Sequence, residues 1–181
     1  MEQNKTVIQL EQTIEQASLD LLARAKIISD AFWQNREEML EVRAGGAKPI
    51  LGCRVSSADD SLRIVWFYYS FYKRNGVVKR TNVHITKSKK NNQYSLTKLY
   101  ARALPSEMDA VKHCETAFGK LRGEAEALRK IKQNLYYYKK ACGLIDAKDD
   151  ERAITQAEVD DEPASNFGKA IEELEGKSDE S

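Results

Sequence analysis

Apolar residues near the N-terminus recur at steps of three, four and seven, the spacing that places side chains along one stripe of an α-helix. The pattern holds from residue 5 to residue 43, a stretch without glycine or proline. It predicts one helix of about 38 residues, roughly 57 Å long. Two glycines and a proline within residues 44–49 end it, because they cannot continue a helix. The stripe is made of Val7, Leu10, Ile14, Ala17, Leu21, Ala25, Ile28, Phe32 and Met39.

Three segments after this helix have the β-branched and aromatic content that is typical of strands. The second and third are joined through Asn75-Gly76. Asn-Gly between two such runs indicates a two-residue hairpin turn, because both central positions of that turn favour positive φ. Such a turn also fixes the register: residues pair when their numbers sum to 151, so that Tyr68 faces Val83. The three segments are residues 50–56, 62–72 and 77–86.

The predicted register gives the hairpin two different faces, because successive side chains of a strand alternate between faces. One face is apolar, and we expect it to meet the helices with Trp66 and Tyr68 buried. The opposite face combines rings, cations and hydrogen-bonding groups, and we expect it to be exposed. A slip of one residue would exchange the faces. The apolar face consists of Leu62, Ile64, Trp66, Tyr68 and Tyr72, and the opposite face of Arg63, Phe67, Tyr69, Phe71, Lys73, Arg80, Asn82 and His84.

Beyond the hairpin, the chain predicts a basic loop, a short ordered segment and a second long helix. The loop covers residues 87–92, and Tyr94–Leu99 fits either a fourth strand or the start of a short helix. The second helix is expected from Ser106 to about Cys142, with Gly143 as its stop. Its apolar stripe is Val111, Cys114, Phe118, Leu121, Ala125, Leu128, Ile131 and Leu135.

Together these elements predict an α+β fold, with a small antiparallel sheet centred on the 62–86 hairpin and packed on two long helices. Residues 1–143 are expected to form one domain. In residues 146–181 acids dominate and apolar residues are scarce, so we expect a mostly disordered acidic tail. The parts of the domain are the helix 1–44, the basic sheet region 50–103 and the helix 106–143.

The formal net charge is only +1, yet the charges are strongly segregated. Residues 145–181 carry four cations and thirteen acids, whereas Ser61 to Ser106 contain no Asp or Glu. An acid-free, cation-rich segment threaded with aromatic rings suits a polyanion, since cations displace counterions and rings stack on bases. The ten cations of this segment are Arg63, Lys73, Arg74, Lys79, Arg80, Lys87, Lys89, Lys90, Lys98 and Arg102.

Residues that commonly perform catalysis are sparse. Three cysteines, Cys53, Cys114 and Cys142, are far apart, which indicates reduced thiols rather than a disulfide framework. The histidines, His84 and His113, lie in different predicted elements, so they do not form a paired-histidine metal site. We therefore expect no enzymatic activity, no metal and no cofactor. No run approaches the ~20 apolar residues of a membrane span, so we expect no membrane association and a cytoplasmic location.

These features favour non-enzymatic, sequence-specific binding of double-stranded DNA by a homodimer, which suits a palindromic or repeated site. A two-stranded ribbon fits the major groove, where Arg can make two hydrogen bonds to guanine and Asn two to adenine. Arg80, Asn82 and His84 are expected nearest the base edges. Phosphate contacts are assigned to Lys73, Arg74, Lys87, Lys89 and Lys90, and the remaining DNA-surface residues are Arg63, Phe67 and Tyr69.

Two other functions remain open. An aromatic sheet face also stacks unpaired bases, which would make the chain an RNA-binding module. The long helices and the aromatic face could instead bind proteins, which would make it a structural adaptor. Independently of these functions, the rings of Phe67, Tyr69 and Phe71 could be buried under a helix or in a dimer interface, and His84 and the 87–90 loop could simply be solvated.

Residues 62 to 135 combine an aromatic-basic strand, a basic stretch and a long helix, in that order. This pattern resembles the MobI-type conjugative transfer proteins of integrative elements and large plasmids, over about 40% of the chain. The resemblance implies an auxiliary relaxosome factor that acts at the origin of transfer and helps the relaxase engage it. Ser106 stands where a tryptophan is expected in that family. The pattern is carried by Arg63-Ile64-Val65-Trp66-Phe67-Tyr68, Tyr94-Ser95-Leu96, Glu107-Met108, Glu115-Thr116-Ala117-Phe118 and Leu121-Arg122-Gly123-Glu124-Ala125-Glu126-Ala127-Leu128.

Overall fold

The structure is a computed structural model, and its contacts group the chain into two units, Met1–Leu135 and Tyr136–Ser181. The sheet and the hydrophobic core belong to the first unit. Lys89, Lys90 and the acidic tail lie outside the described residues, so the predictions for them stay predictions. The structure describes residues 2–42, 48–58, 61–88 and 91–145.

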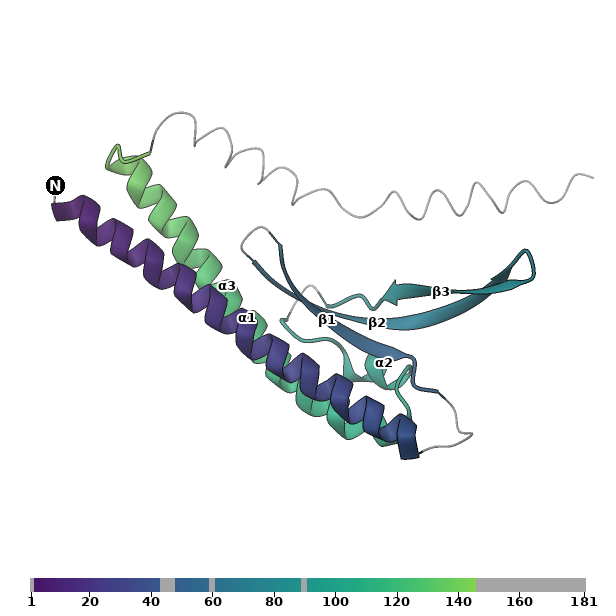
Figure 1. The fold of residues 1–181 in the computed structure, drawn as a ribbon. Coiled ribbons are helices and arrows are strands. Elements are labelled where there is room, and N and C mark those ends of the chain that lie inside the picture. The colour runs from purple at the N-terminus through teal and green to yellow at the C-terminus, as the bar shows by residue number, and fades with distance from the viewer. Residues whose placement is uncertain (1, 43–47, 59–60, 89–90, 146–181) are drawn as a thin grey trace, which may run out of the picture. The chain divides into compact units, whose positions relative to one another are not determined.

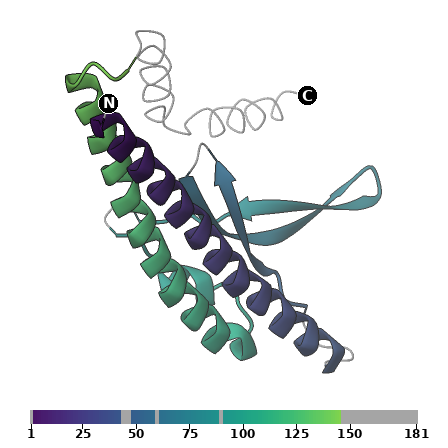
Figure 2. The same cartoon turned by 60° about the vertical axis from the view of Figure 1, so that its left-hand side comes forward.

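The two long helices are α1 (Glu2–Val42) and α3 (Met108–Ala141), and within the first unit α1 and residues 108–135 of α3 run side by side (Figure 1, Figure 2). Both begin and end close to the predicted residues, because the period of their apolar stripes is a strong local signal. Arg24 of α1 and Glu124 of α3 form an exposed ion pair, with Nη1 and Oε2 2.7 Å apart. Of the predicted stripe of α1, Val7, Ile14, Leu21, Ala25 and Phe32 are buried, whereas Leu10 is exposed.

The sheet has three antiparallel strands in the order β1-β2-β3: β1 (Leu51–Ala58), β2 (Ser61–Arg74) and β3 (Val77–His84). The predicted hairpin register is confirmed, since Tyr68 pairs with Val83. Asn75 and Gly76 have φ of 52° and 79°, as a two-residue turn with two positive φ angles requires. The fold is therefore the predicted α+β arrangement of a small antiparallel sheet and long helices.

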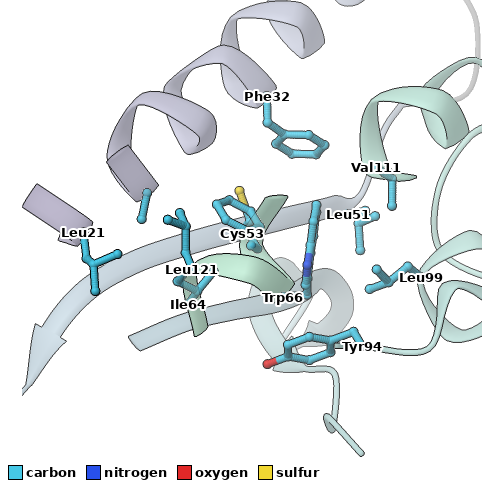
Figure 3. Packing of buried hydrophobic residues seen from close by; sticks show 12 residues of the cluster. Leu21, Phe32, Leu51, Cys53, Ile64, Trp66, Tyr94, Leu99, Val111 and Leu121 are labelled. Atoms are coloured by element: carbon cyan, nitrogen blue, oxygen red, sulfur yellow. The ribbon is translucent and has the colours of Figure 1, made fainter. Parts of the chain in front are cut away.

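The hydrophobic core lies between the helices and the apolar face of β2 (Figure 3). Trp66 is fully buried, and its ring meets Phe32 of α1 edge-to-face at 5.2 Å and Phe118 of α3 at 6.0 Å. Such pairs contribute about 0.5–1.5 kcal/mol beyond the burial of their area. The same face loses its cover farther along β2: Tyr68 is half-buried, and Tyr72, expected against the helices, is 46% exposed.

Glu115 and Arg122 of α3 form a buried ion pair beside this core. The Glu115 carboxylate accepts hydrogen bonds from the Trp66 indole (2.7 Å), the Tyr94 backbone N–H (2.6 Å) and both terminal nitrogens of Arg122 (2.9 Å each). Glu115 and Arg122 are 2% and 7% exposed. A buried charge is tolerated when it is paired and its lone pairs are satisfied. The network thus joins β2, the segment after β3 and two turns of α3.

Between the sheet and α3, the chain forms a short helix rather than a fourth strand. Helix α2 (Leu96–Tyr100) buries Leu99 in the core, which settles the alternative left by the sequence. A 3₁₀ turn, η1 (Pro105–Glu107), leads into α3, and the Glu107 carboxylate accepts the Leu104 N–H at 2.8 Å. At the other end of α3, Gly143 has φ of 66° and lies just past the helix, as predicted for its stop.

Candidate nucleic-acid interface

The outer part of the hairpin, here called the β2–β3 ribbon (residues 69–84), extends past the helices (Figure 1, Figure 2). Every residue from 71 to 82 is exposed. No acid occurs between Ser61 and Ser106, so the ribbon's surface charges are all positive. The two-residue turn produces this shape, because it keeps the strands paired to the tip. The cations of the ribbon are Lys73, Arg74, Lys79 and Arg80.

One face of the ribbon presents a row of hydrogen-bonding side chains along β3. Arg80, Asn82 and His84 are exposed and occupy every second position of β3, so they share a face. Their partners across the hairpin are Phe71, Tyr69 and Phe67 respectively. Neighbouring members of the row are about 7 Å apart along the strand. The row therefore combines an arginine, an amide and an imidazole on a strand open to an external partner.

A tyrosine supports the first member of this row. The Arg80 guanidinium lies over the Tyr69 ring at 4.4 Å, and Arg36 of α1 lies near the same ring at 5.5 Å. Burial, more than any neighbouring charge, lowers the pKa of Arg36, and the positive charge of Arg80 lowers it further. The half-buried Tyr69 thus holds Arg80 in place rather than presenting an open ring.

Phe67 does not reach the surface, and its predicted exposure is wrong. It is 3% exposed and lies beneath Trp33 of α1, with ring centroids 6.4 Å apart. The approach depends on Gly52, its pairing partner on β1: a Cβ there would lie 2.8 Å from both the Phe67 and the Trp33 rings. Phe67 is therefore part of the packing that supports the ribbon, and it has no ring face to offer a nucleic acid.

Helix α1 also closes the free edge of β1. The Trp33 indole donates to the Cys53 carbonyl at 3.2 Å, and Arg36 donates to the carbonyls of Leu51 (2.7 Å) and Pro49. These carbonyls belong to alternate residues and point away from β2. Covering an edge in this way prevents pairing with another strand. β3 forms the other edge of the sheet, because it is the last strand in the order β1-β2-β3.

The remaining predicted residues fall in different places. Lys73 and Arg74 lie at the ribbon tip, at the end of β2, and Arg80, Asn82 and His84 lie along β3. Arg63 is exposed at the start of β2, six residues and about 20 Å of strand from Tyr69. Arg63 and the half-buried Lys87 line a separate cavity instead. The structure thus brings six of the predicted DNA-surface residues together on the ribbon and separates Arg63 and Lys87 from it; the six are Tyr69, Lys73, Arg74, Arg80, Asn82 and His84.

Several residues that shape this site are not marked by the sequence pattern. Trp33 and Arg36 cover the β1 edge, and Trp33 also covers Phe67, but the apolar period of the predicted helix assigns neither of them a role. Arg122, which belongs to the second predicted helix, is buried on Glu115. Two further guanidinium–ring contacts support the sheet: Arg54 lies over Phe67 at 5.6 Å and Arg102 over Tyr68 at 4.3 Å.

The thiols of the core have the properties of packed apolar groups. Burial raises the pKa of Cys53 to about 12 and that of Cys114 to about 11. Among the described residues, no three His, Cys, Asp or Glu side chains cluster in a way that could hold a metal ion. None of the helices in the described ranges combines the length and apolar character of a membrane span.

The fold and this surface define a small α+β protein with a cationic β-ribbon held by two long helices. The family model described as "MobI protein" matches residues 21–136, a span that includes the whole sheet and most of α3. The chain belongs to the MobI family, and so to the conjugation-related mobilisation proteins. No curated protein and no solved structure matches the chain.

Proposed function

We propose that this protein binds double-stranded DNA at an origin of transfer through the β2–β3 ribbon and helps a relaxase engage that site during conjugation. The role is non-enzymatic: the chain recognises and positions DNA in the cytoplasm, and the strand chemistry belongs to the relaxase. The family supplies the process of mobilisation. The step from mobilisation to DNA recognition rests on the geometry and charge of the ribbon.

The exposed row of Arg80, Asn82 and His84 on an acid-free ribbon carries the proposal. A two-stranded ribbon fits the major groove, which is about 12 Å wide. There, Arg80 would pair with a guanine edge and Asn82 with an adenine edge, since each side chain can make two hydrogen bonds to that base. Stacking on Tyr69 at 4.4 Å reduces the conformational freedom that Arg80 would lose on binding.

Phosphate contacts follow from the same placement. Lys73 and Arg74 precede the turn and Lys79 follows it, so cations flank the reading row at the ribbon tip. Lys89 and Lys90, a few residues after β3, would add contacts to the same backbone. These charges would fix the register of the protein on the duplex, whereas the row would supply sequence preference.

A homodimer and a relaxase contact complete the proposal. Two copies would place two ribbons on a palindromic or repeated site. The tail from residue 145 to 181 carries four cations and thirteen acids. That charge would attract a basic partner such as a relaxase, or screen the ribbon from nonspecific DNA.

The test is fluorescence anisotropy with duplex DNA from the origin region of the element that encodes the chain, in a salt series. Arg80→Ala should weaken specific binding by ~1–3 kcal/mol and relax the preference at one base pair. Asn82→Ala should relax a different position. The same variants should lower the transfer frequency in a mating assay.

Lys26→Ala is the matched control, because it removes one exposed cation from α1 instead of the ribbon. It should bind within about twofold of the wild type, as expected for a charge remote from the contact. Equal losses for Lys26→Ala and Arg80→Ala would argue against the ribbon as the recognition element. Unchanged binding and transfer in Arg80→Ala would favour the adaptor function instead.

Single-stranded nucleic acid is a second candidate ligand. Phe71 and Tyr72 near the ribbon tip are 59% and 46% exposed, and exposed rings stack unpaired bases. Binding a single strand more tightly than the matching duplex at the same salt concentration, with a loss in Phe71→Ala, would favour this function. Both ligands predict salt dependence, so the comparison must be made within one series.

A further inference from the structure

A cavity of about 540 Å³ lies on the helix side of the sheet, at the start of β2. Its walls come from α1, residues 61–65 of β2, the segment after β3 and α3. The volume falls within the range of small-molecule sites, about 300–1,000 Å³. The ribbon residues Lys73, Arg74 and Arg80 are not part of its lining.

The lining of this cavity is cationic. Five cations contribute to it, with Glu126 as the carboxylate of the same lining. Glu126 accepts two hydrogen bonds from Arg129, each 3.0 Å long. These hydrogen bonds are the main reason why the pKa of Glu126 is lowered. Arg122 is already matched by Glu115. The lining therefore has a net positive charge, and its cations are Arg63, Lys87, Arg122, Arg129 and Lys132.

Lys87 is a half-buried cation of this lining, with the carboxylates of Glu115 and Glu126 acting on it as well as Arg122. Burial lowers its pKa, and the neighbouring positive charge of Arg122 lowers it further. A negatively charged ligand would offset both effects, because an opposite charge within a few ångströms favours the ammonium form. Arg63 of β2 also belongs to the lining, and it is exposed.

The rest of the wall is apolar. Leu21, Leu62, Ala125 and Leu128 line the cavity beside the cations. A pocket with an apolar wall and a few convergent charges suits a ligand that has an apolar body and an anionic end. Inorganic phosphate alone would leave the apolar wall uncovered, whereas a nucleotide would cover both parts.

We propose that this cavity binds a nucleoside phosphate, with the phosphate at Lys87 and Arg63 and the base against Leu62 and Leu128. The ligand would be either a free nucleotide or the terminal nucleotide of a DNA strand, since both present the same chemistry. The site is separate from the ribbon, because Arg63 lies about 20 Å of strand from Tyr69. Nucleotide binding in this cavity can therefore be tested independently of duplex binding by the ribbon.

The test is isothermal titration calorimetry of the full chain with ADP at low salt, beside adenosine and pyrophosphate as its two separate halves. ADP should bind one to one and more tightly than either half. Lys87→Ala and Arg63→Ala should each weaken ADP about tenfold, as expected for a lost hydrogen bond to a charged group. Lys79→Ala, which removes a ribbon cation, should leave the ADP affinity within about twofold.

Two DNA competitors identify the source of the ligand. A duplex with a 5′-phosphorylated overhang that displaces ADP, beside a closed dumbbell that does not, assigns the site to a strand end. Failure of both DNAs to displace ADP assigns it to a free nucleotide. Absence of saturable ADP binding, equal losses in Lys79→Ala and Lys87→Ala, or equal displacement by both DNAs would overturn the proposal. Duplex binding by the Arg80 variant is scored separately, so the two proposals can fail separately.

Discussion

Arg122 and Arg80 each lie over a tyrosine ring, but in different regions of the molecule. Arg122 is 4.9 Å from the Tyr94 ring, 7% exposed and matched by the Glu115 carboxylate. Arg80 is 4.4 Å from the Tyr69 ring, exposed, and on a ribbon without acids. In the core a cation needs its own carboxylate, because an unpaired buried charge is very costly. On the ribbon that carboxylate is absent, which leaves Arg80 able to meet a phosphate or a base edge.

The comparison predicts that changes under the helices alter stability, whereas changes on the ribbon alter binding. Glu115→Gln should show the largest effect, a loss of about 3–5 kcal/mol, because it leaves the Arg122 charge buried without its partner. Urea unfolding followed by the fluorescence of the two tryptophans, Trp33 and Trp66, measures this loss. The double variant with Arg122→Met should recover part of it. A loss below about 1 kcal/mol in Glu115→Gln would break the comparison.

Thiol reactivity gives the next largest contrast. With a pKa of about 12 for Cys53 and about 11 for Cys114, about 0.1% or less of either thiol is thiolate at pH 8. Cys142 is exposed and should react with Ellman's reagent at least about a hundredfold faster than Cys53 and Cys114. One fast thiol per chain in the native protein and three after denaturation are the expected counts. Two or three fast thiols in the native state would show that the core opens easily.

Two glycines should respond to alanine with opposite signs. A Cβ at Gly52 would lie 2.8 Å from the rings of Phe67 and Trp33, so Gly52→Ala should cost about 1–3 kcal/mol through overpacking. At Gly123 in α3 a Cβ would lie 3.7 Å from Asn92, and Gly123→Ala should stabilise the helix by roughly 0.5–1 kcal/mol. Thermal unfolding of both variants measures the difference. Equal shifts would show that α1 does not hold Phe67 tightly against β1.

The smallest effect on stability is expected at the ribbon tip. Lys73→Ala with Arg74→Ala should change the free energy of unfolding by less than about 0.5 kcal/mol, since both side chains are exposed. If each contacts one phosphate, the salt dependence of duplex binding should fall by about 1.8 in the slope of log K against log salt. An unchanged slope would exclude the tip from the DNA contact. A large loss of stability would place the tip within the cooperative core.

Local chemistry explains which parts of the fold could be read from the sequence. Asn75-Gly76 fixed the turn and, with it, the pairing of Tyr68 with Val83, because a two-residue loop allows only that register. The helices followed from apolar periods over many residues. The candidate site was predictable only in part: Arg80, Asn82 and His84 lie where alternation placed them, whereas Phe67 on the same face is buried.

The sequence by itself determined the elements, the hairpin register and the acid-free basic segment, since each depends on neighbours along the chain. Tertiary structure alone decided which of the rings Phe67, Tyr69 and Phe71 are exposed to solvent. Trp33 crosses the β1 edge over Gly52 and covers Phe67. Tertiary structure also decided that Arg122 pairs with Glu115 inside the core and that Lys87 lines a cavity. These outcomes depend on contacts between residues far apart in the chain, which local period and composition do not encode.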